Sequence, residues 1–111
     1  MEIDEEKKEG VVILSLNGRL DALTAKGLEK KFFSLLESQE KHFAINFCQL
    51  DYISSGGLRV LLKAAKVLKK DNGKIVLYAL KDPIKEIFEI AGFVTLFPIY
   101  PDEAVALRSF Q

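Results

Sequence analysis

The sequence has little of the chemistry that metal sites, disulfides and hydrolytic enzymes need. Cys48 is the only cysteine and His42 the only histidine among 111 residues. A lone cysteine excludes a disulfide within the chain, and one cysteine with one histidine argues against a structural zinc site. No apolar run approaches the ~20 residues of a membrane span. We therefore expect no metal, no cofactor and no membrane partner.

The sequence also lacks net charge. Its 16 Lys and Arg residues balance 16 Asp and Glu residues. Because no Lys/Arg block is dense, nucleic acid is not expected as a partner. The acidic start, Met1–Glu6, lacks the basic and apolar regions of a signal peptide, which predicts a cytoplasmic protein. The length of 111 residues and hydrophobic content of 49% predict one domain, residues 1–111, with one core.

Strand-like and helix-like segments alternate along the chain. Strands are predicted at residues 2–8, 11–16, 43–48, 74–80 and 95–100, with Pro98 indicating an edge strand. Helices are predicted at residues 23–37, 57–70 and 83–91 and after Asp102, with Asp21 or Thr24 capping the first and Asp82 the third. This order predicts an α/β fold: a mixed, mainly parallel sheet of about five strands with an N-terminal hairpin and four helices. Cys48 is expected in the core.

Two serines and two glycines, Ser54 to Gly57, stand where a strand gives way to a helix. A helix N-terminus favours an anion, so the pattern indicates a bound phosphate or a hydroxyl that becomes phosphorylated. A plain N-cap with small residues for close packing explains the pattern equally well. Since loops after parallel strands meet at one end of a sheet, Asp21 is expected near these serines.

Two enzymatic interpretations of this turn fail on particular residues. A serine hydrolase would use Ser55 as nucleophile, but His42 precedes the strand that Ser55 follows, roughly 20 Å away at ~3.3 Å per residue. A nucleophile and its base need a separation of about 3 Å. A nucleotide-binding phosphate loop requires a lysine after the glycines, where the nearest base is Arg59. A binding role is favoured.

The helix after the turn carries basic residues on one side. They can form a solvated face or a docking surface for an acidic partner, and the sequence leaves both possibilities open. The residues are Arg59, Lys63, Lys66, Lys69 and Lys70.

Two separated motifs resemble one known family. Leu16–Asp21 matches the pattern L-x-G-x-[LI]-D, and Asp51–Leu58 matches D-x-[IVM]-[DS]-S-x-G-[LI]. With Gly73-Lys74-Ile75 and the segment 83–93, the chain resembles the anti-sigma factor antagonists. These are bacterial single-domain members of the sulfate-transporter and anti-sigma antagonist (STAS) family.

The resemblance implies a phosphorylation switch. Ser55 falls at the phosphoacceptor position, and the expected partners are an anti-sigma factor that is also a serine kinase and a serine phosphatase. The unphosphorylated form would bind the anti-sigma factor and so release a sigma factor. The best-known members have Asp where this chain has Ser54, so Ser54 can compete as acceptor. The resemblance implies a kinase and partner surface made of Asp21, Ser54, Gly56, Gly57, Leu58 and Arg59.

The expected function is therefore that of a switched binding module, non-enzymatic and monomeric when free. Two alternatives stay open. One is a STAS subunit that is never phosphorylated and acts as a scaffold in a transporter or stress-signalling complex. The other is an enzyme with Ser55 as nucleophile, which the position of His42 disfavours.

Overall fold

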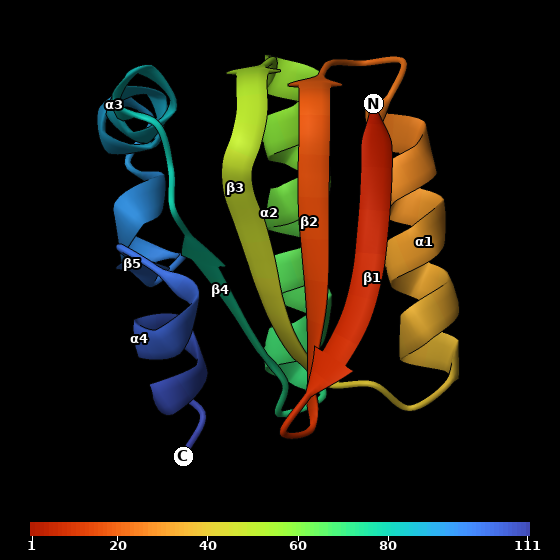
Figure 1. Cartoon of the computed structure of the whole chain (residues 1–111). Coiled ribbons are helices and arrows are strands. Elements are labelled where there is room, and N and C mark those ends of the chain that lie inside the picture. The colour runs from red at the N-terminus through yellow and green to blue at the C-terminus, as the bar shows by residue number, and fades with distance from the viewer.

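The chain opens with a β-hairpin. In the computed structural model, which describes residues 1–111, β1 (Glu2–Lys8) pairs antiparallel with β2 (Val11–Leu20) (Figure 1). Glu9 and Gly10 connect them with φ angles of 53° and 80°. Two positive φ angles are what a tight two-residue hairpin turn requires. The predicted hairpin is confirmed.

Three further strands extend the sheet on the β2 side. The strands β3 (His42–Ile53), β4 (Lys74–Tyr78) and β5 (Ile99–Tyr100) continue in the order β1-β2-β3-β4-β5. The pairs β2–β3, β3–β4 and β4–β5 are all parallel. The predicted mixed, mainly parallel five-stranded sheet is confirmed.

Helices connect the parallel strands. The crossovers contain α1 (Ala25–Glu37), α2 (Ser55–Lys70) and α3 (Asp82–Ile90), and a short 3₁₀ turn, η1 (Phe93–Thr95), follows α3. The fourth helix, α4 (Glu103–Arg108), follows β5. None of these helices has both the length and the hydropathy needed to span a bilayer.

Alternate residues of the strands enter two separate cores. On β2, Leu14 and Leu16 face the larger core under α1 and α2, while Val11 and Ile13 belong to a smaller cluster under α4. Figure 1 shows α2 behind the sheet. The period of two in the strands therefore directs apolar residues to both faces. One core had been predicted, but the short α4 adds the second.

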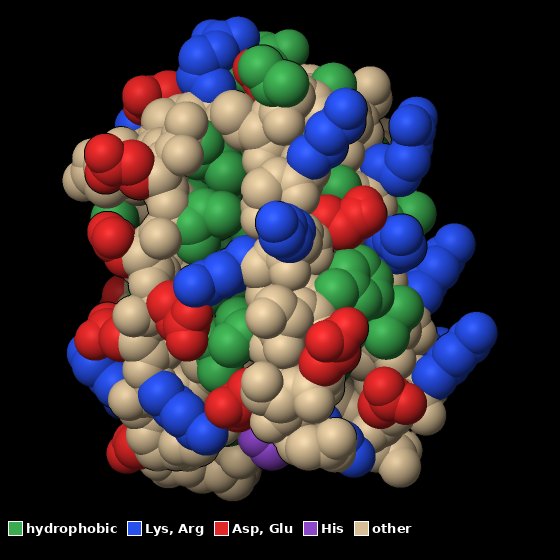
Figure 2. Space-filling model, turned by 90° about the vertical axis from the view of Figure 1, so that its right-hand side faces the viewer, with side chains coloured by type: hydrophobic (Ala, Val, Ile, Leu, Met, Phe, Trp, Pro, Cys, Tyr) green, Lys and Arg blue, Asp and Glu red, His purple; other side chains and the backbone are tan.

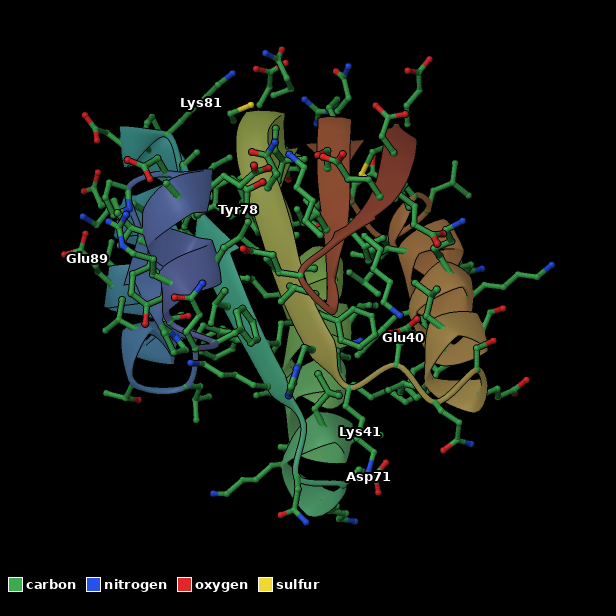
Figure 3. The ribbon with its side chains drawn as sticks, turned by 60° about the horizontal axis from the view of Figure 1, so that its bottom comes forward. Glu40, Lys41, Asp71, Tyr78, Lys81 and Glu89 are labelled. Atoms are coloured by element: carbon green, nitrogen blue, oxygen red, sulfur yellow. The ribbon has the colours of Figure 1, made fainter.

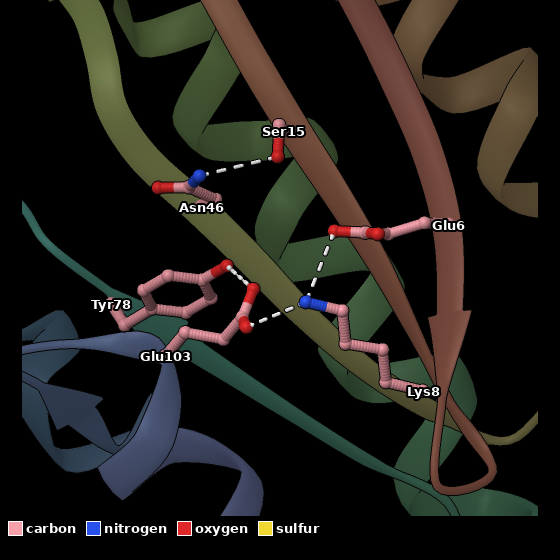
Figure 4. Close-up of polar contacts among 6 residues, drawn as sticks. All are labelled: Glu6, Lys8, Ser15, Asn46, Tyr78 and Glu103. Carbon is pink, nitrogen blue, oxygen red and sulfur yellow. Dashed lines mark hydrogen bonds and ion pairs between the residues drawn. The ribbon is translucent and has the colours of Figure 1, made fainter.

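A polar cluster fixes α4 to the sheet (Figure 4). Glu103 on α4 accepts hydrogen bonds from Lys8 Nζ at 2.9 Å and from the Tyr78 hydroxyl at 3.2 Å. Lys8 also lies 3.8 Å from a carboxylate oxygen of Glu6. Burial raises the pKa of Tyr78, and the nearby Glu103 carboxylate raises it further. The tyrosine therefore stays neutral and donates to Glu103.

Cys48 is exposed, so its predicted place in the core is wrong. It lies on the sheet face that α4 partly covers, and α4 is only six residues long. On that face of β3, Ala44 is the last buried residue. The next residue on the face, Asn46, is half-buried, and its side-chain amide donates to Ser15 Oγ at 3.2 Å. The helix is too short to reach Cys48.

Several element boundaries also differ from the prediction. The strand predicted at 43–48 extends to Ile53, because two register shifts, each with one extra residue in β3, let β2 and β3 pair as far as Leu20 and Ile53. The first helix begins at Ala25, since residues 22–24 form a turn that leaves Leu23 77% exposed. The cap position of α3 is Lys81, one residue before Asp82. The last strand shrinks to Ile99–Tyr100, which is an edge strand as Pro98 indicated.

Candidate functional site

The carboxyl ends of β2 and β3 lie side by side. Leu20 and Ile53 are register partners, and the Ser54 N–H donates to the Leu20 carbonyl at 2.9 Å. A Cβ placed on Gly56 would lie 3.0 Å from the Cα of Ala22. The loop that starts at Asp21 therefore touches the serine turn, and both lie at the end of the sheet to which the β2 and β3 arrows point (Figure 1).

The two serines have different environments. Ser54 occupies the N-cap of α2 with extended backbone, and its hydroxyl accepts from the Gly57 N–H at 3.3 Å. Ser55 is the first residue of the helix and is exposed, and its hydroxyl makes no hydrogen bond within the protein. The capping explanation of the serine pair therefore applies to Ser54, and it leaves Ser55 without a structural role.

The two glycines bring α2 close to the sheet. Gly57 is buried, and a Cβ there would lie 2.7 Å from Leu20 Cγ and 2.9 Å from the Leu20 carbonyl oxygen. Real Cβ atoms do not approach backbone so closely, so only glycine fits. Gly56 and Leu58 are half-buried, while Arg59 is exposed. Of the predicted partner residues, only Arg59 is exposed, as is the predicted phosphoacceptor Ser55.

Asp21 fixes the conformation of its own loop. Its Oδ1 accepts from the backbone N–H groups of Leu23 and Thr24, each at 3.0 Å. The Thr24 N–H bond holds the pKa of Asp21 below its usual range, and desolvation opposes this shift. Asp21 therefore closes the turn before α1 and does not cap the helix. The N-cap of α1 is Thr24, as one of the two predicted alternatives had it, but its side chain makes no cap bond, because Thr24 Oγ1 donates to the Arg19 carbonyl at 2.7 Å. The result is an ionised carboxylate on the loop beside the serine turn.

Three exposed side chains at this end of the sheet had not been assigned to the site. Leu23 is 77% exposed and Tyr52 is 39% exposed. The Arg19 guanidinium carbon lies 4.1 Å from the centre of the Tyr52 ring, a cation–π contact. The sequence pattern places Leu23 in the first helix, because it fits the helical spacing of the residues that follow it. Arg19 and Tyr52 are found only once the register of β2 and β3 is known.

His42 lies far from this site. It is the first residue of β3, whereas Ser55 comes after the last, so the 12-residue strand separates them. Its ring lies 5.4 Å from that of Phe110. His42 is therefore out of reach of Ser55, as the sequence predicted.

Comparison with known proteins agrees with this geometry. BtrV of Bordetella bronchiseptica, a protein assigned as an anti-sigma factor antagonist, is 35% identical over 100% of this chain and 96% of its own length. An anti-sigma factor antagonist structure from Mycobacterium paratuberculosis has a TM-score of 0.88 at 24% identity, covering 97% of this chain and 92% of its own. The Bacillus cell fate determinant SpoIIAA in its phosphorylated form has a TM-score of 0.79 at 18% identity, covering 99% and 100%. Residues 2–106 match the STAS domain, and the chain belongs to the STAS domain family.

Proposed function

We propose that this protein is an anti-sigma factor antagonist that Ser55 phosphorylation switches off. In its unphosphorylated form it binds an anti-sigma factor with serine kinase activity and so releases a sigma factor. The observation that carries the proposal is the contrast between the two serines. Ser54 is engaged as a cap, whereas Ser55 is exposed, has a free hydroxyl and occupies the acceptor position of the motif.

The fold can accept a phosphate at Ser55 without rearrangement. The first turn of α2 contains no acidic residue, and a helix N-terminus favours negative charge. A phosphate adds about −1.5 to −2 charge at pH 7. A partner surface that fits the neutral hydroxyl then meets a bulky dianion beside the ionised Asp21, which weakens docking. A serine phosphatase reverses the change.

The role we propose is binding without catalysis. Ser55 has no base within reach, because His42 lies at the other end of β3. The protein is proposed to act as a monomer when free and to contact no nucleic acid. The names of its relatives support this class, since the B. bronchiseptica protein and an anti-sigma F factor antagonist of Paenibacillus polymyxa match the whole of this chain.

The test is phosphoryl transfer followed by calorimetric binding. The protein is incubated with ATP and the anti-sigma factor of its own organism, and its intact mass is measured. Wild type and Ser54→Ala should each gain one phosphoryl group, while Ser55→Ala should gain none and still bind the anti-sigma factor. Ser55→Asp should bind more weakly, by on the order of 1–3 kcal/mol. Equal affinity for all variants, with no phosphate on Ser55, would refute the switch and favour the scaffold.

A further inference from the structure

The helix α2 carries charge of one sign only. Its 16 residues include five cations and no carboxylate, although the whole chain is neutral. Lys69 and Lys70 in the last turn complement the helix dipole, and Lys63 pairs with Glu29 at 3.3 Å. Neither explanation applies to Arg59 or Lys66, which form no ion pair. The helix therefore carries more positive charge than its own stability requires.

These cations share a face with Ser55. Residues three or four positions apart are neighbours on a helix, so one row runs along α2 from Ser55 to Lys69. Figure 2 shows Lys and Arg side chains projecting along its right-hand edge, where α2 lies behind the sheet of Figure 1. The residues of the row are Ser55, Arg59, Leu62, Lys66 and Lys69; all are exposed except Leu62, which is half-buried.

A groove opens beside the second half of this row. Its volume is about 670 Å³, and it lies between α2, the start of β4 and the segment after η1. Leu62 and Ala65 line one side, and Leu96 and Pro98 line the other. Of its three lysines, Lys74 donates to the Ser109 carbonyl and lies 4.9 Å from the Phe110 ring centre. Lys66 and Lys69 remain unpaired, and no carboxylate lines the groove.

The far side of the groove exposes apolar side chains. Leu96, which lines the groove, is 49% exposed. Val94 and Ile90, which precede it in the chain and are not part of the lining, are 42% and 80% exposed. Exposed apolar side chains beside charged ones are typical of interaction sites in soluble proteins. The chemistry of the groove therefore fits a ligand that is apolar on one side and acidic at its edges.

We propose that the groove between α2 and η1 binds an acidic amphipathic segment of the anti-sigma factor. The segment places apolar side chains between Leu62 and Leu96, and its carboxylates pair with Lys66 and Lys69. The occupant follows from charge complementarity and from continuity, since the row of residues that ends in the groove begins at Ser55. This inference rests on the function proposed above.

The groove and the phosphorylation site act independently. Ser55 and Lys66 are eleven residues apart, which corresponds to about 16 Å along the helix axis. Figure 3 places Asp71, the C-cap of α2, at the opposite end of the molecule from Lys81, which pairs with Asp51 near the serine turn. The Debye length at physiological salt is about 8 Å. A phosphate on Ser55 therefore leaves the contacts in the groove intact.

The experiment is calorimetric binding of the full chain to the anti-sigma factor. The test variant carries Lys66→Glu and Lys69→Glu. The control carries Lys30→Glu and Lys85→Glu, which change the same charge on exposed lysines of α1 and α3 that form no ion pair. Leu96→Ala is a third variant that changes no charge. Circular dichroism melts confirm that each variant is folded.

The test variant should bind on the order of tenfold more weakly than wild type, whereas the control stays within about twofold. Leu96→Ala should also weaken binding. The loss of binding free energy caused by the lysine reversals should be the same with and without Ser55→Asp, because the effects of substitutions at distant sites are additive. If wild type binds but the lysine reversals behave like the control, the groove proposal is wrong and the proposed function stands. If wild type does not bind, the proposed function fails and the groove proposal fails with it.

Discussion

Gly57 lies against Leu20 so closely that no side chain fits between them. A Cβ at position 57 would come within 2.7 Å of Leu20 Cγ and 3.1 Å of Ile53 Cγ1. This contact sets how near the first turn of α2 lies to the ends of β2 and β3. The position of Ser55 at the surface therefore depends on a glycine two residues away.

Replacing Gly57 with alanine should destabilise the protein. We expect a loss of about 1–3 kcal/mol in the free energy of unfolding, because the added methyl group overpacks against β2. Urea denaturation at constant protein concentration measures this loss. The matched control is Gly27→Ala in α1, where a Cβ would meet nothing within 4 Å. That change should stabilise the protein by up to about 1 kcal/mol through helix propensity, and equal effects of the two substitutions would contradict the packing argument.

The two serines should contribute differently to the stability of the fold. Ser54→Ala removes the cap on Gly57 and should cost about 1 kcal/mol. Ser55→Ala removes a hydroxyl that has no partner in the protein and should change stability by less than about 0.5 kcal/mol. Thermal or urea unfolding of the two variants is the measurement. A larger loss from Ser55→Ala than from Ser54→Ala would show that the cap has been assigned to the wrong serine.

Asp21 should contribute to the loss of stability in acid. Hydrogen bonds from Thr24 and Leu23 lower the pKa of this carboxyl in the folded state. Its contribution is therefore present above the unfolded pKa of about 3.9 and is lost as the pH falls through the lower folded value. Urea unfolding at several pH values below about 4 should show a smaller pH dependence in Asp21→Asn than in wild type. Identical slopes would mean that the Asp21 carboxylate does not hold the loop.

Arg59 should lower the pKa of a phosphate on Ser55. The two residues are four apart on α2, which is the spacing at which helical side chains pair. In protein carrying phosphoserine at position 55, Arg59→Gln should raise the pKa of the phosphate, normally about 6, by a few tenths of a unit. Phosphorus NMR titration measures this pKa without any partner protein. Lys85→Gln on α3 is the control and should leave the titration unchanged, so equal shifts would point to general charge rather than to a pair.

The order of strands and helices could be predicted because each has a local signal. The apolar, β-branched run Val11–Leu16 and the proline at Pro98 were sufficient for the hairpin strand and the edge strand. The end of β3 could not be predicted, since the polar residues Gln49 and Asp51 are not typical of a strand. Gln49 and Tyr52 pair with β2 only because the register shifts twice, with Asp51 skipped at the second shift. Leu23 and Cys48 were misplaced for a related reason, because their exposure depends on where a loop and the short α4 lie.

At the site, the motif was enough to place Asp21 and the serine turn at one end of the sheet, but not to divide the roles of the two serines. The assignment of Ser54 as the cap follows from the helix starting at Ser55, two residues earlier than the predicted residue 57. The groove could not be predicted from the sequence either, since Leu62 and Leu96 come from segments that only the tertiary fold brings together. The lysines on α2 were visible in the sequence, but which of them lack partners was not.

The two edge strands of the sheet, β1 and β5, limit how this protein can bind a partner. β1 is lined with Glu2, Asp4, Glu5 and Glu6, and charged residues on an outer strand oppose pairing with another chain. At the other margin, β5 has only two residues and follows Pro98, which has no N–H to donate. Both features oppose recruitment of a partner by addition of a strand. We therefore expect the proposed recognition to depend on side chains, so that a single change of charge at one of them, such as a phosphate on Ser55, weakens it.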